Sequence, residues 1–186
     1  MSEIRTARLV LRPPVLADAP DVASYVGDFD IARMLARVPH PYALADAQWW
    51  IGTQATPEGL AKERVFVALR EGALVGACSH LFGKRAGSAE IGYWVGKPHW
   101  GQGYCTEMTR TLIRDGFATL GLDAITVSHM IDNASSAAVI AKFGFRPTGR
   151  RQISCTARGC EVEVLTYAMS RAEAEAKPWW ITATQK

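Results

Sequence analysis

The stretch EIGYWVGKPHWGQGYCTE, residues 90–107, limits what this chain can fold into more than any other part of the sequence. Apolar Ile91, Tyr93 and Val95 recur at every second position, which is the period of a β-strand. Pro98 then ends the strand, because proline has no amide hydrogen to donate to a neighbouring strand. We therefore expect a strand that stops just before a turn.

Two glycines and a helix follow this strand. Gly101 and Gly103 allow the backbone a positive φ and a close approach to a ligand. A helix that starts near Tyr104 would point unpaired amide hydrogens and the positive end of its dipole at the turn. Such a turn suits a phosphate or a pyrophosphate, although two glycines alone would favour an ordinary loop.

The complete string WGQGYC, from Trp100 to Cys105, resembles the acyl-CoA-binding motif of the GNAT acetyltransferase superfamily, Gln/Arg-x-x-Gly-x-Gly/Ala after a strand. Trp100 stands where many members have Gln or Arg, and Cys105 replaces the final Gly or Ala. The form WGxGY-small-TE is similar to the RimJ/RimL branch, which acetylates the N-terminal amines of ribosomal proteins and includes relatives that act on other amines. The resemblance implies acetyl-CoA as the acetyl donor. The residues that it places at this cofactor are Trp94, Val95, Gly96, Trp100, Gly101, Gln102, Gly103, Tyr104, Cys105 and Thr106.

A second string, NASSAAVIAKFGFRP, begins at Asn133. It resembles the family signature Asn-x-x-Ser-x-x-x-x-x-Lys-x-Gly-Phe. The resemblance implies that Asn133 reaches the pantetheine arm and that the following helix flanks the cofactor. Without the first motif, Asn133 would be interpreted as a helix cap only.

The resemblance covers roughly residues 4–173 and implies an α/β (α+β) fold, the GNAT acyl-CoA N-acyltransferase fold. This fold has a mixed, mostly antiparallel sheet flanked by helices, with splayed central strands. The β-rich segment 124–130 follows an amphipathic helix, so it should form a parallel crossover with the strand before the glycine turn. In the implied fold the thioester arm lies between these two strands. The backbone amides of Trp94 to Gly96 then bind pantetheine or polarise the acetyl carbonyl.

Direct acetyl transfer needs a neutral amine, a carbonyl held beside it and a route for protonating the departing thiolate. Glu90 is the first candidate for deprotonating the amine, directly or through water, and a solvent-facing strand glutamate is the equal alternative. Glu161 and Glu163 are other candidate bases. Much of the superfamily has a tyrosine acid seven residues after the signature Asn, and that position is Ile140 here. By resemblance to the RimJ/RimL branch, Ser136 becomes the candidate proton donor, or else it binds the cofactor or caps its helix.

Residues 31–59 are helical in pattern and rich in aromatic and basic side chains. Ala45 and Trp49 fall on one helical face, so we expect one tryptophan of the Trp49-Trp50 pair in the core. In the family, this helical region forms one wall of the acceptor groove.

At 186 residues, with 48% hydrophobic residues, the chain has the size of one globular domain with a full core. We expect a single N-acetyltransferase domain over residues 1–173 and a C-terminal tail over 174–186. Trp179 and Trp180 in that tail either fold back on the body or enter a dimer contact, so both a monomer and a homodimer are open.

The composition also excludes several classes. A formal net charge of +3 is mild for a nucleic-acid-binding protein, and no window is long enough for a membrane span. The four cysteines form no zinc-type cluster, so we expect reduced thiols, no metal and a cytoplasmic protein.

The function expected from these observations is transfer of the acetyl group of acetyl-CoA to a primary amine, first of all the N-terminal α-amine of a protein such as a ribosomal protein. One alternative acceptor is a small amine, such as an aminoglycoside, a polyamine or an amino acid. A third reading is a non-catalytic acyl-CoA-binding module.

Overall fold

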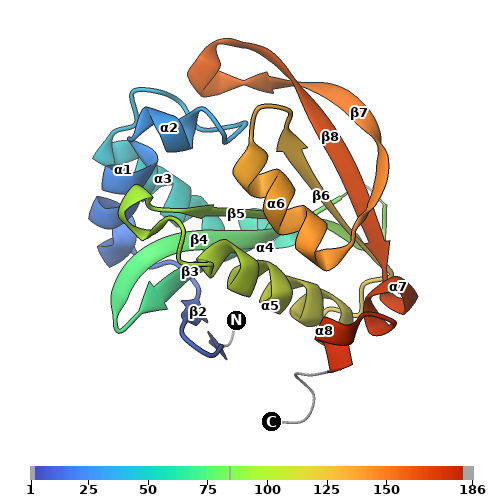
Figure 1. The fold of residues 1–186 in the computed structure, drawn as a ribbon. Helices are drawn as coiled ribbons and strands as arrows, with labels where there is room; N and C mark the ends of the chain where they lie inside the picture. The colour runs from blue at the N-terminus through green and yellow to red at the C-terminus, as the bar shows by residue number, and fades with distance from the viewer. Residues whose placement is uncertain (1–2, 84, 182–186) are drawn as a thin grey trace.

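One sheet runs through the molecule in the computed structural model, which describes residues 3–83 and 85–181. Its strands are β1 (Ile4–Arg5), β2 (Val10–Arg12), β3 (Glu63–Arg70), β4 (Ala73–Phe82), β5 (Ser88–Val95), β6 (Ala124–Met130), β7 (Arg146–Cys155) and β8 (Cys160–Ser170). Their spatial order is β1-β2-β3-β4-β5-β6-β8-β7 (Figure 1). Neighbours are antiparallel except β5 and β6, which are parallel. The expected mixed, mostly antiparallel sheet is confirmed.

Helices cover both faces of this sheet. They are α1 (Ala19–Val26), α2 (Phe29–Ala32), α3 (Leu44–Gln54), α4 (Pro57–Lys62), α5 (Tyr104–Ala118), α6 (Ala134–Phe143), α7 (Arg171–Glu175) and α8 (Pro178–Ile181). Short 3-10 turns are η1 (Leu16–Asp18), η2 (Lys97–His99) and η3 (Thr156–Arg158). Buried residues of α5 and α6 pack on one face, and those of α1 and α3 pack on the other. No helix in the described parts of the chain has the length and apolar character needed to cross a membrane.

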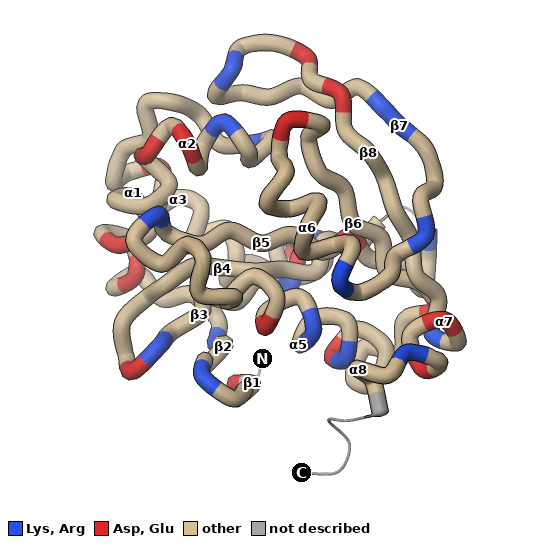
Figure 2. Tube along the Cα trace, in the orientation of Figure 1, with Lys and Arg blue, Asp and Glu red and all other residues tan. Residues whose placement is uncertain are grey.

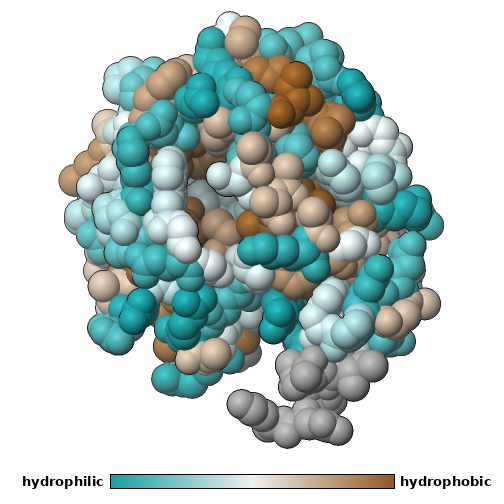
Figure 3. Space-filling model, in the orientation of Figure 1, coloured by the Kyte–Doolittle hydropathy of each residue, from teal (hydrophilic) through white to brown (hydrophobic). Residues whose placement is uncertain are grey.

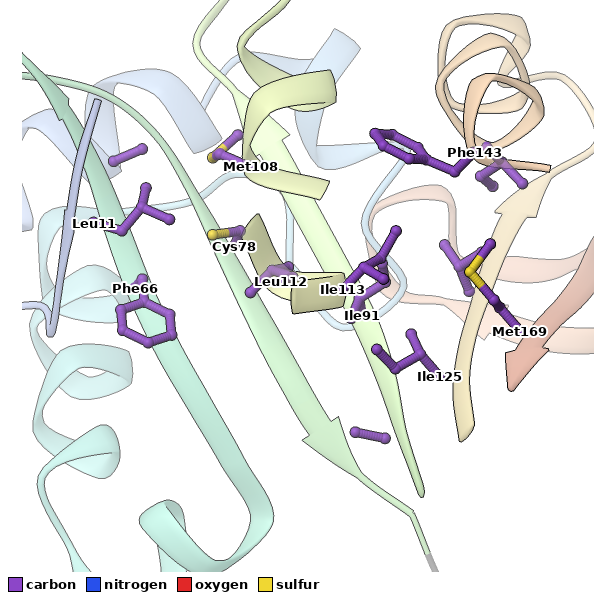
Figure 4. Close-up of a cluster of buried hydrophobic side chains, with 14 of the residues drawn as sticks. Leu11, Phe66, Cys78, Ile91, Met108, Leu112, Ile113, Ile125, Phe143 and Met169 are labelled. Carbon is purple, nitrogen blue, oxygen red and sulfur yellow. The ribbon is translucent and has the colours of Figure 1, made fainter. Parts of the chain in front are cut away.

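The larger core lies between α5 and the sheet (Figure 4). Met108, Leu112 and Ile113 recur at helical spacing along α5 and are fully buried. They pack with strand residues such as Phe66 and Ile125 in the same cluster. Burying each such side chain stabilises the fold by about 1.5–3 kcal/mol. This packing fixes the start of α5 relative to the end of β5.

The two parallel strands separate after a short paired region. Their register covers Ser88↔Ala124, Ala89↔Ile125 and Glu90↔Thr126, whereas β5 continues to Val95 and β6 to Met130. The ends of β5 and β6 are therefore held by β4 and β8 rather than by each other. This is the expected splay of the central strands.

The predicted buried face of α3 is wrong. Trp49 is 72% exposed, and the buried residues of this helix are Ala47 and Ile51. Trp50 is half-buried and packs against the cluster under α1 and α3. One tryptophan of the pair is therefore in contact with the core, but the helix is rotated relative to the prediction.

The C-terminal helices pack against the body of the protein. Ala174 is fully buried in the main core cluster, and half-buried Trp179 and Trp180 pack against the same cluster. The Trp179 ring meets Phe143 edge-on, with ring centroids 5.2 Å apart. Of the two alternatives for this pair, the structure shows that it folds back on its own chain. The four cysteines are free thiols, as expected.

Candidate active site

The glycine turn connects β5, through η2, to the first turn of α5. Gly101 and Gly103 have φ of 74° and 80°, and Gly103 caps the 15-residue helix α5. A Cβ built at Gly101 would meet no atom within 4 Å, so the backbone there is open to a ligand. Arg8 Nη1 donates to the Gln102 carbonyl at 2.9 Å, and Trp100 Nε1 donates to the Val95 carbonyl at 2.8 Å. The turn is thus fixed from both sides.

The side chains of Tyr104 and Gln102 in this turn are hydrogen-bonded to each other. Tyr104 is 1% exposed, and its hydroxyl donates to Gln102 Oε1 at 2.9 Å. Arg70 contacts the same hydroxyl. Because these contacts occupy the side chains of Tyr104 and Gln102, these two residues can contact a phosphate at the helix start only through their backbone amides. Burial raises the pKa of the Cys105 thiol, in the next position, to about 12, so this thiol is neutral.

A cleft of about 1110 Å³ brings the two sequence motifs together. It runs between the separated ends of β5 and β6 and the starts of α5 and α6, and a hollow is visible near the centre of this face in Figure 3. All of the predicted site residues line it except Gly96 and Gln102. Those that line it are Glu90, Trp94, Val95, Trp100, Gly101, Gly103, Tyr104, Cys105, Thr106, Asn133 and Ser136.

The backbone of β5 offers fewer free amides than predicted. The Gly96 amide donates to the Val75 carbonyl at 2.9 Å, so it is already used within the sheet. Because N–H groups alternate between the two sides of a strand, the Trp94 amide also points at β4, and the Val95 amide points into the gap. The predicted oxyanion donors, Trp94 to Gly96, are therefore reduced to Val95.

A tyrosine hydroxyl meets the candidate serine across the gap. Tyr93 Oη lies 2.9 Å from Ser136 Oγ, and burial raises the pKa of Tyr93 to about 12. The Asn133 side chain accepts a hydrogen bond from the Ser136 amide at 3.0 Å, so Asn133 does cap α6. Ile140, where the superfamily tyrosine would stand, is buried in the core. Sequence reasoning missed Tyr93; its signal was a polar-tipped residue at an inward position of the strand before the glycine turn.

Glu90 lies at the narrow end of the separation between β5 and β6. Ser128 donates its hydroxyl hydrogen to Glu90 Oε1, and Arg151 lies 3.5 Å from Oε2. The Glu90 side chain is 32% exposed. Since residues three apart on a strand point to opposite faces, Glu90 and Tyr93 flank β5 from opposite sides. Neither Ser128 nor Arg151 was singled out from the sequence.

The other candidate bases lie outside the cleft. Glu161 is exposed, and Glu163 pairs with Arg150 at 3.2 Å on the β7–β8 hairpin. Neither lines the cleft. Within residues 3–83 and 85–181, no group of three or more His, Cys, Asp or Glu side chains is placed to hold a metal ion.

Comparison with known proteins matches the part of the chain that contains Glu90, the glycine turn and Ser136. The family model "Acetyltransferase (GNAT) domain" matches residues 8–146. The chain is 26% identical over 175 residues to the uncharacterized N-acetyltransferase p20 of Bacillus licheniformis, covering 93% of this chain and 98% of that one.

Solved structures share the fold. RimL, a ribosomal L7/L12 alpha-N-protein acetyltransferase in complex with coenzyme A, superposes with a TM-score of 0.79 at 18% identity, over 91% of this chain and 98% of its own. Mycobacterium smegmatis RimJ, in complex with CoA-disulfide, superposes with a TM-score of 0.76 at 22% identity, over 89% of this chain and 83% of its own.

Proposed function

The chain belongs to the acetyltransferase (GNAT) domain family, and from this membership we propose that it transfers the acetyl group of acetyl-CoA to the N-terminal α-amine of a protein. The observation that carries the transfer chemistry is the position of Glu90 and of the Tyr93–Ser136 pair on opposite faces of β5, both lining one cleft. A protein acceptor is supported by the similarity to RimL, which is described as an alpha-N-protein acetyltransferase.

The residues at the glycine turn fit coenzyme A. The backbone at Gly101 and Gly103 and the first amides of α5 would hold the pyrophosphate, since a helix start favours negative charge. Asn133 and Ser136 at the start of α6 would flank the pantetheine arm. When bound, acetyl-CoA supplies an acetyl group activated as a thioester. The Val95 amide would donate to the oxygen of that acetyl group and stabilise the charge that develops on it.

Glu90 would remove the proton from the acceptor amine, directly or through a water molecule. A free N-terminal α-amine has a pKa of about 7.7–8.0, so modest assistance from a carboxylate suffices near neutral pH. Ser128 and Arg151 hold the two carboxylate oxygens and so set the direction of the side chain. This orientation is what general-base catalysis requires.

The Tyr93 hydroxyl would give its proton to the departing thiolate on the other side of β5. Ser136 Oγ lies within hydrogen-bond distance and would donate a hydrogen bond to Tyr93 Oη while that oxygen is deprotonated. The tyrosine would then regain its proton from water, so Ser136 supports the proton donor and keeps its own proton.

The test is thiol release from acetyl-CoA by the purified protein with peptides that begin with Ala, Ser or Met and with a panel of small amines. We expect release with peptides, and a loss of about 10²–10⁴-fold in kcat for Glu90→Gln with unchanged acetyl-CoA binding. Release with small amines alone would replace the protein acceptor by a metabolite. Binding of acetyl-CoA without release in any mixture would contradict catalysis altogether.

A further inference from the structure

The carboxylates that line the cleft are each compensated by a cation. The pairs are Glu63 with Arg37 at 3.2 Å, Glu90 with Arg151 at 3.5 Å, Asp132 with Arg158 at 2.9 Å and Asp30 with Lys97 at 2.7 Å. Acidic and basic positions are accordingly mixed around α2, α6 and the β7–β8 hairpin (Figure 2). A site that selects a polycation presents uncompensated negative charge, because complementary potentials determine which partner is favoured. The charges therefore do not favour an aminoglycoside or a polyamine as the acceptor.

Apolar side chains form the wall beside Glu90. Met130 and Val164 are 3% and 1% exposed and make the floor, while Met34 and Ile153 are half-buried. All four line the cleft. We call these four residues the apolar subsite. Methionine is unbranched and polarisable, so it adapts to apolar groups of different shape.

Strand geometry places the apolar subsite next to the candidate base. Ser128, which donates to Glu90, precedes Met130 by two positions on β6, and Arg151 precedes Ile153 by two positions on β7. Residues two apart share a face and lie about 7 Å apart along a strand. The register pairs Met130 with Val164 and Val164 with Arg151, so Ile153 lies one two-residue step beyond Met130. The subsite therefore begins at Met130 and Val164, about 7 Å along the sheet from the serine that holds Glu90, which is comparable to the reach of a long side chain from its own α-amine.

Hydrogen bonds from the turn between β7 and β8 to the segment that follows α2 hold Met34 in the apolar subsite. Arg158 Nε donates to the Arg33 carbonyl at 2.7 Å, and the Thr156 amide donates to the Ala36 carbonyl at 3.0 Å. Arg158 Nη2 also lies 3.3 Å from Met34 Sδ. The turn between β7 and β8 thus ties the Met34 segment to the strand that carries Ile153.

We propose that the acceptor carries an apolar side chain on its first residue, and that this side chain binds in the apolar subsite while the α-amine lies at Glu90. The proposal rests on N-terminal acetylation as the function. It narrows the acceptor class to protein N termini that begin with a residue such as Met, Leu or Phe.

The first test compares peptides that are identical after the first residue and begin with Met, Leu, Ala, Ser, Asp or Lys. We expect kcat/KM for Met and Leu to exceed that for Ala by tenfold or more, since each buried methylene is worth about 10–200-fold in a fitted apolar pocket. Equal rates for all peptides, or a preference for Ser, Asp or Lys, would overturn the subsite and leave N-terminal acetylation standing. Release with no peptide would overturn the proposed function and this inference with it.

The second test uses Ile153→Ser with Val162→Ser as its matched control. Val162 is the register partner of Ile153 and belongs to the same cluster, but it does not line the cleft. Ile153→Ser should lower the Met-to-Ala ratio of kcat/KM toward one, and Val162→Ser should keep it near the wild-type value. Met34→Ala should act like Ile153→Ser and serves as a second probe if that variant does not fold. An unchanged ratio in a folded subsite variant would refute the proposal.

Discussion

The Tyr93 hydroxyl is the single group whose contacts bear most on the chemistry, because it lies 2.9 Å from Ser136 Oγ inside the cleft. Burial raises its pKa to about 12, so the phenol keeps its proton through the neutral range. A group that holds its proton at rest is suited to act as the acid when a thiolate leaves beside it.

Replacing Tyr93 by Phe should therefore lower kcat by about 10²-fold or more while leaving the acetyl-CoA Kd nearly unchanged. Single-turnover transfer and equilibrium binding measure the two quantities. Ser136→Ala should lower kcat less than Tyr93→Phe, because the tyrosine proton remains available. Wild-type kcat in Tyr93→Phe would remove the phenol from the mechanism, and a larger defect in Ser136→Ala would make the serine the direct donor.

At the scale of secondary-structure elements, the start of α5 depends on the N-terminal segment. Glu107, in the first turn of α5, accepts hydrogen bonds from Thr6 Oγ1 at 2.6 Å and from the Arg8 amide at 2.8 Å. Arg8 Nε is 2.7 Å from the same carboxylate. Burial opposes ionisation of Glu107, but the Thr6 and Arg8 contacts outweigh it and hold the pKa below its ordinary value.

The pKa shift of Glu107 makes its contribution to stability depend on pH. At pH values between the lowered pKa of Glu107 in the folded protein and its ordinary pKa, the unfolded chain binds more protons than the folded one. The stabilisation from Glu107 is therefore fully present above the ordinary pKa and is lost as the pH falls through the folded-state pKa. We expect Glu107→Gln to lower the free energy of unfolding by about 1–3 kcal/mol at pH 7. Urea unfolding at pH 7 and at about pH 3 should show the difference shrinking with acid. A difference of equal size at both values would contradict the electrostatic origin.

Three glycines with positive φ, two in the glycine turn and one beyond α5, can be compared. Gly101 and Gly103 border the cleft, whereas Gly121, with φ of 66°, follows α5 and does not line it. Alanine at any of them strains the backbone by about 1–2 kcal/mol. We expect Gly101→Ala and Gly103→Ala also to raise the acetyl-CoA Kd about tenfold, because a Cβ would separate the ligand from the backbone amides. Gly121→Ala should change stability alone, and a matching rise in its Kd would point to general loosening of the fold.

Local sequence patterns were enough to predict the elements around the site. The period of β5, the two glycines and the crossover to β6 were each visible in short segments, and the parallel pair followed from them. The splay of that pair was expected only from the resemblance to the family. The facing contacts were not visible in this way. Glu90 meets Ser128 and Arg151, 38 and 61 residues away, only because β5, β6, β8 and β7 align in one register. The same dependence on register decided that the Gly96 amide turns toward β4.

At the scale of the whole molecule, the sheet separates the two halves of the proposed reaction. Glu90 and the apolar subsite lie toward α1 and α2, and Tyr93 with Ser136 lies toward α5 and α6. An amine and a thioester can therefore meet at the gap between β5 and β6 from opposite faces. The remaining elements act on this arrangement by keeping α5 and α6 in place.

The C-terminal helices serve that structural purpose, which leads to a separation of stability from catalysis. Trp179 packs edge-on against Phe143 of α6, and Arg114 of α5 donates to the Trp180 carbonyl. Complete truncation of a buried tryptophan costs about 3–5 kcal/mol, so half-buried Trp179→Ala should cost about 2 kcal/mol and lower the Tm by about 4–8 °C. Because none of residues 171–180 lines the cleft, kcat and the acetyl-CoA Kd at 25 °C should stay at their wild-type values. Calorimetry and thiol-release assays on the same sample measure both. A change in molecular mass in solution would instead assign Trp179 to a contact between two copies of the chain.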